Sequence, residues 1–470
     1  MSYPRGAKPM SLDEWPLGHE RERVLGLLRR FGWDATSVQV LEVGFRYFFF
    51  DDDACVAYVD TGSAWVAAGA PLAADARMAK VTEAFVGTAQ AAGRRACFFA
   101  TEERFRALVP LRSLLIGEQA TWDPSEWTAA VRGSRSLREQ LRRARAKGVR
   151  VRAVTLDGLG LRSVPLRRAI RELVQRWERE RELAPMGFLA RVNPLALLPD
   201  HRLFLAERYE VLVGLLSVAP VYGRRGWFLQ NLLRSPDAPN GSSEALVDCA
   251  MREALRAGAT FVTLGLAPLA GEVRVPLRVA RTLGGGLYSF EGLRAFKAKL
   301  QPTGWDRIFL SFPERTGSIL AIFDVLTAFA RGRLLRFGLR TLLRGPAVVV
   351  SLLAVLLVPW TLLLAVADTH RWFPHPGLKW AWVGFDALLA SGLFALRSRW
   401  RDGLARLLTV AIGVDAMLTA IEGVSWNASR APGAIAKLVL LAAVAAPAVA
   451  FLVVGRASAR HSVPGNGRAG

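Results

Sequence analysis

The chain has 470 residues, of which 52% are hydrophobic, and its 62 Lys and Arg against 40 Asp and Glu give a formal net charge of +22. This length exceeds one ordinary domain of roughly 100 to 200 residues. The 14 Trp and 24 Phe exclude a disordered chain, which lacks apolar side chains to bury. The three cysteines, Cys55, Cys97 and Cys249, are too few and too far apart for a disulfide framework or a cysteine metal site. We expect several domains and no bound metal.

The N-terminal third predicts a first α/β half. Residues 1–35 read as a helical extension without the apolar core of a signal peptide. From residue 38 to about 101 the runs FRYFFF, CVAYVD, WVAAG and CFFAT predict strands, with a helix through Phe85 before the last of them. Residues 36–155 are assigned to this half, which ends in a basic helix.

That basic helix lies in residues 134–152, which carry eight basic side chains and one acid, Glu139. On a helix, side chains three or four apart share a face. One face would hold Arg135, Arg138, Arg142 and Arg145, and another would hold Leu137 and Leu141. A solvated surface is the plain interpretation. The dominance of one sign favours a polyanion partner, either RNA phosphates or anionic lipid head groups.

Residues 156–315 predict a second α/β half. Helical pattern comes first, around 165–182, followed by the strands YEVLVGLLSVAPVY and GWFLQNLL, a helix at about 243–256, and the strands TFVTLGLA and DRIFLSF. The two halves have similar element orders. We therefore expect an α+β protein built by tandem duplication of one unit.

The junction between GWFLQNLL and its following helix is a candidate anion site. A strand ends near Arg234, and the helix starts at Asn240 or Ser242, either of which can cap it. Free backbone N–H groups at a helix start bind phosphate. Acyl-CoA N-acyltransferases place a glycine-rich pyrophosphate loop at such a junction, but this one has the single glycine Gly241. Acyl-CoA is thereby disfavoured as the donor.

Five blocks in order resemble a known family. They are SLREQLRRARAKG at 136–148, the run from Arg234 to Gly241, Glu244, LGLAPLAG at 264–271 and LYSFEGLRAFKAKLQP at 287–302. Over roughly residues 40–315 the chain resembles the C-terminal domain of bacterial phosphatidylglycerol lysyltransferases, the aminoacyl-phosphatidylglycerol synthases. The resemblance implies tandem GNAT-like (acyl-CoA N-acyltransferase-like) domains. It also implies transfer of an amino acid from aminoacyl-tRNA to a phospholipid hydroxyl such as that of phosphatidylglycerol, with no cofactor.

The chain departs from the family in two respects. The family often has Asp three residues before the motif arginine, where this chain has Asn231. The loss of that acid argues against lysine as the transferred amino acid. Members that make lysyl-phosphatidylglycerol usually carry a large membrane domain before the catalytic one, whereas here the apolar segments follow it.

Transfer of an aminoacyl ester to a hydroxyl needs positioning, a proton acceptor and oxyanion stabilisation rather than a covalent nucleophile. We assign Arg234 to a phosphate, and Glu244 or Glu291 to the substrate ammonium or to the base. Lys297 and Lys299 lie two apart, so on a strand they would share a face and grip the tRNA acceptor end or the lipid phosphate.

Further substrate contacts are expected at Asn231, Asn240 and Gly241. Plainer interpretations stand beside these roles. Glu244 would only complement its helix dipole, Glu291 would pair with Arg294, and Lys297 would be ordinary surface.

Residues 316–345 predict an amphipathic basic linker to the membrane. The run GSILAIFDVLTAFA at 317–330, followed by Arg331 and Arg333, indicates a helix lying on the inner membrane surface.

Residues 346–456 predict four transmembrane helices, since a span needs roughly 20 apolar residues. The apolar runs extend from Pro346 to Ala367, Trp380 to Leu396, Leu404 to Ile421 and Ala434 to Val454. Arginines gather before the first run, between the second and third, and after the fourth, which places both termini and the tail at 457–470 in the cytoplasm. We expect a multi-pass protein of the bacterial inner membrane with its catalytic part cytoplasmic.

Two acids, Asp386 and Asp415, fall inside these runs and are expected to face the bundle interior. Structural pairing with Asn or Arg groups is favoured, and contact with lipid or a proton is the alternative.

Two other functions remain open. One is an acyl-CoA-dependent N-acyltransferase acting on a lipid or a membrane-bound amine, and the other is a non-catalytic protein that binds anionic lipid.

Overall fold

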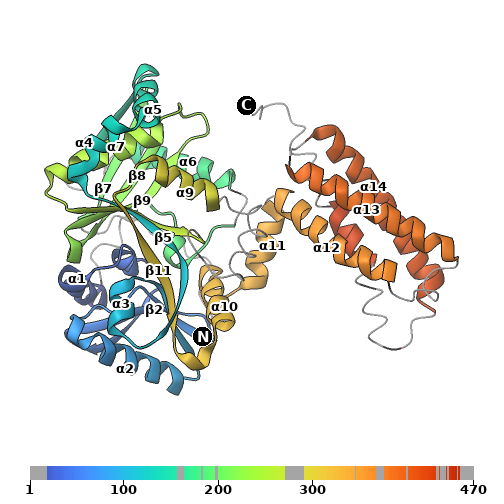
Figure 1. Ribbon diagram of the computed structural model, residues 1–470, viewed down its shortest axis with the longest axis horizontal. Helices are drawn as coiled ribbons and strands as arrows, with labels where there is room; N and C mark the ends of the chain where they lie inside the picture. Colours follow the sequence, from blue (N-terminus) through green and yellow to red (C-terminus); the bar gives the residue numbers. More distant parts are fainter. Residues whose placement is uncertain are drawn as a thin grey trace. The chain divides into compact units, whose positions relative to one another are not determined.

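The computed structural model of the chain describes most of its residues (Figure 1). The described ranges are 18–155, 164–181, 184–195, 200–269, 290–344, 346–366, 375–398, 401–429, 433, 441, 444–452 and 454–455. The chain forms two compact units, one of residues 1–180, 185–285 and 289–336, and one of residues 181–184, 286–288 and 337–470.

The described part of the first unit contains one sheet of 11 strands, in the order β1-β2-β3-β4-β11-β5-β10-β9-β8-β7-β6. The strands are β1 (Arg46–Asp51), β2 (Ala54–Asp60), β3 (Ala64–Ala68), β4 (Arg95–Thr101), β5 (Arg112–Trp122), β6 (Val149–Thr155), β7 (Arg202–Arg208), β8 (Val211–Val221), β9 (Gly226–Arg234), β10 (Phe261–Pro268) and β11 (Gly304–Phe312). Two pairs are parallel, β3 with β4 and β9 with β10, and the other neighbours are antiparallel.

The two halves of the sheet exchange a strand. β5 follows β4 in the sequence but pairs with β10 of the second half. β11 follows β10 but pairs with β4 of the first half. The two exchanged strands pair with each other along the register from Gly304–Thr121 to Phe312–Arg112. One sheet therefore runs through both halves.

Helices cover both faces of this sheet. They are α1 (His19–Phe31), α2 (Met78–Ala91), α3 (Glu103–Leu108), α4 (Trp127–Gly133), α5 (Arg135–Ala146), α6 (Val164–Arg179), α7 (Ser242–Arg256), α9 (Phe290–Lys299) and α10 (Ser318–Phe329). The next helix, α11 (Leu334–Arg344), begins in the first unit and ends in the second. In the first half, Phe85 of α2 is fully buried and meets Tyr58 and Phe98 edge-on, with ring centroids 5.4 and 5.5 Å away. In the second half, α5 and α7 share a core with β8 and β9.

The elements confirm most of the expected pattern and correct it at specific places. β1 to β4 and α2 lie where the sequence predicted them. β5, β6 and β7 were not anticipated; in β6, Arg150 and Arg152 continue the basic run of α5 and were assigned to the helix. Gly148, at φ 78°, ends α5 and starts the strand that the arginine-rich sequence concealed. The segment DRIFLSF was expected to close the second half, whereas as β11 it lies between β4 and β5.

The second unit is helical in its described part, with α12 (Pro346–Val366), α13 (Pro376–Ser398) and α14 (Asp402–Glu422). One described segment, Asp402–Asn427, is long and apolar enough to cross a membrane, with 26 residues and mean hydropathy 1.8. Of the four expected membrane spans, one is therefore found among the described residues. Lys379, Asp386 and Arg397, together with Gly and Trp, make α13 less apolar than its length suggests, and most of 434–454 lies outside the described residues.

The two acids of this unit are buried as expected. Asp386 on α13 is 5% exposed and Asp415 on α14 is 9% exposed, and Thr419 donates a hydrogen bond to Asp415.

Candidate functional site

The basic helix α5 divides into two faces, as the sequence predicted. Ser134 caps its start by accepting a hydrogen bond from the backbone N–H of Leu137. Leu137, Leu141 and Ala144 are buried against the core of the second half. The arginines at 135, 138, 142, 143 and 145 are all exposed. Packing of the leucines therefore fixes the helix and turns its positive charge outward.

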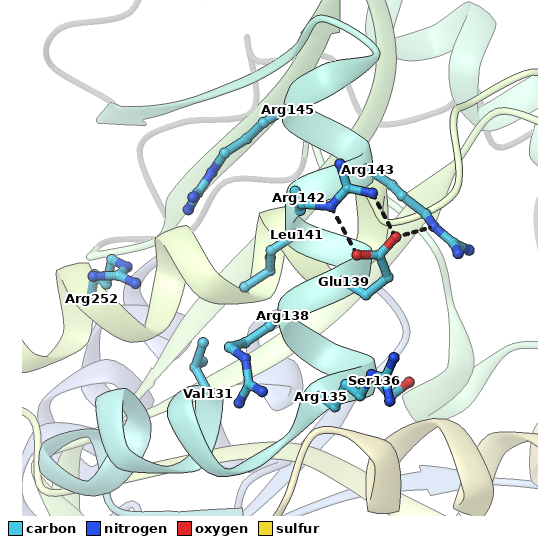
Figure 2. A pocket seen from close by; sticks show the side chains of 10 residues that line it. All are labelled: Val131, Arg135, Ser136, Arg138, Glu139, Leu141, Arg142, Arg143, Arg145 and Arg252. Atoms are coloured by element: carbon cyan, nitrogen blue, oxygen red, sulfur yellow. Dashed lines mark hydrogen bonds and ion pairs between the residues drawn. The ribbon is translucent and has the colours of Figure 1, made fainter.

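An open hollow of about 1130 Å³ lies against this charged face. Figure 2 shows Arg138, Leu141 and Arg145 pointing to the side of α5 where Arg252 of α7 lies. Six of the lining side chains are arginines and one, Glu139, is an acid. A hollow of this charge and openness suits a polyanion, not a small apolar ligand.

Two acids reduce the positive charge of the hollow but do not neutralise it. Glu139 accepts hydrogen bonds from Arg142 and Arg143, which lower its pKa to about 2, so it stays ionised. Buried Asp248 lies 3.1 Å from Arg252 and 3.8 Å from Arg145. Among the described residues, Arg138 has no acidic partner.

The start of α7 is closed by α5. Gly241 is left-handed at φ 93°, and a Cβ added there would lie 2.1 Å from the carbonyl oxygen of Gln140 on α5. Gly241 and Ser242 are buried. The expected cap is wrong, because neither Asn240 nor Ser242 caps the helix through its side chain; the Ser242 hydroxyl donates to Pro239 instead. A phosphate cannot approach this helix start from the side that α5 occupies.

The motif residues on β9 split between surface and core. Arg234 is exposed at the end of the strand, open to an anion. Asn231 is buried and donates to the Ser217 hydroxyl at 2.8 Å. A bulge between these strands places Gln230 beside Asn231 as an additional residue.

Lys297 and Lys299 lie on helix α9, so the expectation that they share a strand face is wrong. Lys299 pairs with Glu244 at 2.7 Å, joining two residues that the sequence assigned to separate roles. Lys297 is 2% exposed, which contradicts its interpretation as ordinary surface.

The ammonium of Lys297 donates to three carbonyls of β10, those of Leu264, Gly265 and Leu266, at 2.6 to 3.0 Å. Burial lowers the pKa of Lys297 to about 7. The three acceptors oppose that shift, since only the charged form has three N–H donors. Lys297 therefore holds the irregular part of β10 in place.

Glu291 is the second residue of α9, but its side chain lies outside the described residues. The expected alternative pairing of Glu291 with Arg294 therefore stays a prediction; among the described side chains, Arg294 forms an ion pair with Glu118 at 3.3 Å.

A buried carboxyl that the sequence did not single out lies beside β9. Glu42 accepts a hydrogen bond from Gln230 at 3.2 Å, and burial raises its pKa to about 7 despite the opposing field of Arg191. A carboxyl that titrates near 7 exchanges protons at neutral pH. Glu42 thus joins Glu244 and Glu291 as a candidate base.

A second such group joins the two halves. Glu102, directly after β4, lies 3.1 Å from Arg224 of the β8–β9 connection, and Arg224 also reaches Asp306 of β11 at 3.5 Å. Burial, reinforced by the charge of Asp34, raises the pKa of Glu102 to about 8. The sequence offers an acid after a strand as its signal, but no indication of this partner.

Comparisons with known proteins agree with the family resemblance seen in the sequence. Residues 26–311 match the family model described as "Phosphatidylglycerol lysyltransferase, C-terminal". The solved L-PGS from Bacillus licheniformis is 22% identical, covers 69% of this chain and 99% of its own, and has a TM-score of 0.57. The C-terminal domain of a putative lysylphosphatidylglycerol synthetase from Agrobacterium fabrum is 21% identical, covers 67% and 96%, and has a TM-score of 0.54. No curated protein matches. At these identities the solved structures support the fold alone.

We predict that Gly241→Ala separates α5 from α7. The control is Gly258→Ala, because Gly258 is also left-handed, at φ 71°, but has open space around it. Both substitutions place an alanine in the left-handed conformation, which destabilises the fold by roughly 1 to 2 kcal/mol. Only Gly241→Ala must also displace Gln140. Its melting temperature should fall further, and trypsin should cut faster within residues 135–147, as mapped by mass spectrometry. Equal proteolysis of the two variants would contradict the contact.

Proposed function

The chain belongs to the family of phosphatidylglycerol lysyltransferase C-terminal domains, and from that premise we propose that it transfers an amino acid from aminoacyl-tRNA to the hydroxyl of a membrane phospholipid such as phosphatidylglycerol. Membership makes the chain a transferase that acts on lipid. The main observation that supports aminoacyl-tRNA as the donor is the exposed arginine face of α5 above its hollow.

The reaction exchanges one ester for another. The lipid hydroxyl oxygen bonds to the aminoacyl carbonyl carbon, the bond from that carbon to the tRNA ribose oxygen breaks, and the hydroxyl proton ends on the ribose oxygen through a base. The ester is already activated, so positioning and charge placement supply most of the acceleration.

Roles for the described residues follow from their surroundings. Glu244 is held by an ion pair with Lys299 at 2.7 Å, and we assign this carboxylate to the substrate ammonium rather than to proton transfer. Glu42, with its pKa near 7, suits the base. Arg234 is exposed and binds a phosphate of either substrate. Lys297, occupied by three carbonyls, positions β10 rather than gripping tRNA.

Two observations support tRNA over the alternative donor, acyl-CoA. Arg138, Arg142 and Arg145 extend along one helix, a spacing suited to successive phosphates rather than to one pyrophosphate. The helix start at which an N-acyltransferase binds that pyrophosphate is covered here by Gln140 of α5.

The transferred amino acid is proposed not to be lysine. Asn231 occupies the position where an acid would meet a cationic side chain, and its amide already donates a hydrogen bond to the Ser217 hydroxyl.

We propose that the chain crosses the bacterial inner membrane four times and that the apolar segment Asp402–Asn427 is one of these spans. α12 and α13 have 21 and 23 residues, enough at 1.5 Å per residue to cross roughly 30 Å of hydrocarbon. The arginine asymmetry of the connecting segments supports an arrangement with both termini in the cytoplasm.

The transfer itself is the first test. Purified full-length protein in phosphatidylglycerol vesicles should move a labelled amino acid from charged tRNA into lipid, and ribonuclease should abolish the product. Arg234→Ala should reduce the rate roughly tenfold or more, since a charge-assisted phosphate contact is worth roughly 1.5 to 3 kcal/mol. Arg112→Ala, at an exposed arginine starting β5, is the matched control. Label arriving from acyl-CoA but from no charged tRNA would reverse the assignment.

Replacing Arg138, Arg142 and Arg145 together by Gln should weaken tRNA binding and flatten its salt dependence. Each lost phosphate contact lowers the slope of log affinity against log salt by roughly 0.7 to 0.9. The control replaces three exposed arginines of α6 with Gln, namely Arg168, Arg171 and Arg179. Filter binding over a salt series measures both. Equal behaviour of the two triple variants would make α5 an ordinary solvated face, and a loss confined to anionic vesicle binding would assign the face to lipid.

The four-span arrangement predicts where reporters lie. A reporter fused after Gly470 should be cytoplasmic, and one inserted near Pro374, outside the described residues, should face outward. Alkaline phosphatase and green fluorescent protein fusions distinguish the two sides. An outward C-terminus would require an odd number of spans.

A further inference from the structure

Helix α10 is apolar on both of its faces. Its inner face, with Ala321, Val325 and Ala328, is buried in the core of the first half. Its outer face exposes four large apolar side chains, Ile319 at 83%, Leu320 at 48%, Phe323 at 48% and Leu326 at 50%. These lie one turn apart in pairs along the helix. A contiguous apolar stripe of this kind marks an interaction surface.

The stripe is held rigidly on the sheet. Asp324, on the inner face, is fully buried, and Arg95 of β4 donates to both of its carboxylate oxygens at 2.8 and 2.5 Å. Ser63 of the β2–β3 turn donates to the same carboxylate at 3.3 Å. Phe329 packs against Phe99 of β4 with centroids 5.2 Å apart. The outer face therefore has a fixed direction relative to the sheet.

Positive charge flanks the stripe at both ends. Arg315 precedes α10, and Arg333 and Arg336 follow it, all of them exposed. Across residues 313–340 the acids are Glu314, which is exposed, and the buried Asp324. An apolar face bordered by basic side chains matches the interface of an anionic bilayer, where apolar groups enter the acyl boundary and arginines meet phosphates.

We propose that the outer face of α10 lies in the surface of an anionic membrane and sets the angle at which the α/β unit meets its lipid. The bidentate ion pair of Asp324 with Arg95 fixes the orientation of α10 against the sheet, so α10 is a rigid contact surface and not a flexible connection. The inference rests on the proposed function for the reason to hold the unit at lipid, but its test does not depend on transfer.

The test places an environment-sensitive dye at Ile319→Cys in the full chain, reconstituted in vesicles with anionic lipid. Cys249→Ala removes the half-buried native thiol, and Cys55 and Cys97 are buried. The control probe is at Val211→Cys, a large apolar residue that is 58% exposed at the start of β8. We expect blue-shifted emission and quenching by lipids brominated on their acyl chains for position 319, and neither for position 211.

Two results would overturn the proposal. Emission at 319 that matches position 211 would place the face in water. Blue-shifted emission without quenching by brominated lipid would mean that protein, either this chain or a second copy, covers the stripe.

A paired variant checks the stripe as a whole. With the dye at Leu326→Cys, adding Ile319→Glu and Phe323→Glu should abolish most of the quenching, while Val211→Glu should leave it unchanged. Both altered side chains are exposed, so the fold should tolerate them, and circular dichroism verifies it. A chain whose dye is quenched but which transfers no amino acid would overturn the proposed function and leave this inference standing.

Discussion

The pairing of β5 with β11 is the constraint on which the first unit depends. Each strand leaves its own half, joins the other half's parallel pair, and meets its counterpart at the centre of the sheet. Neither half can complete its sheet alone, because the strand that would do so is supplied by the other. The halves are thereby fixed in relation to each other, and residues from both are held close enough to share a site, as Glu42 and Gln230 do.

The position of α5 depends on this fixed arrangement of the two halves. α5 connects the halves, packs its leucines on the core beside α7, and approaches so closely that Gly241 has no room for a side chain. The same contact exposes five arginines and closes the helix start that an acyl-CoA would need. In the proposed function, this one packing interaction favours aminoacyl-tRNA over acyl-CoA as the donor.

Three buried charges among the described residues are held by specific partners. Lys297 is satisfied by three carbonyls, Glu244 by Lys299, and Asp324 by Arg95. A buried charge left alone is costly, so each of these pairs restricts the geometry around it. Glu42 differs, since a neutral amide is its hydrogen-bond partner and its pKa is raised to about 7. A carboxyl poised in this way is suited to moving a proton, and it lies next to the motif strand.

The sequence by itself determined the features that local periodicity and composition carry. These are the strands and helix of residues 46–101, the two faces of α5, the α7 segment, the apolar character of the C-terminal part and the family resemblance. Only the tertiary structure decided which elements meet. Lys297 and Lys299 were assigned to one strand face because their spacing fits a strand, whereas the helix around them gives them separate partners. Lys299 meets Glu244 across 55 residues, and Arg95 meets Asp324 across 229. Periodicity reports which side of an element is buried, but a partner distant in the chain is selected by the packing of the whole sheet, and no local pattern encodes that choice.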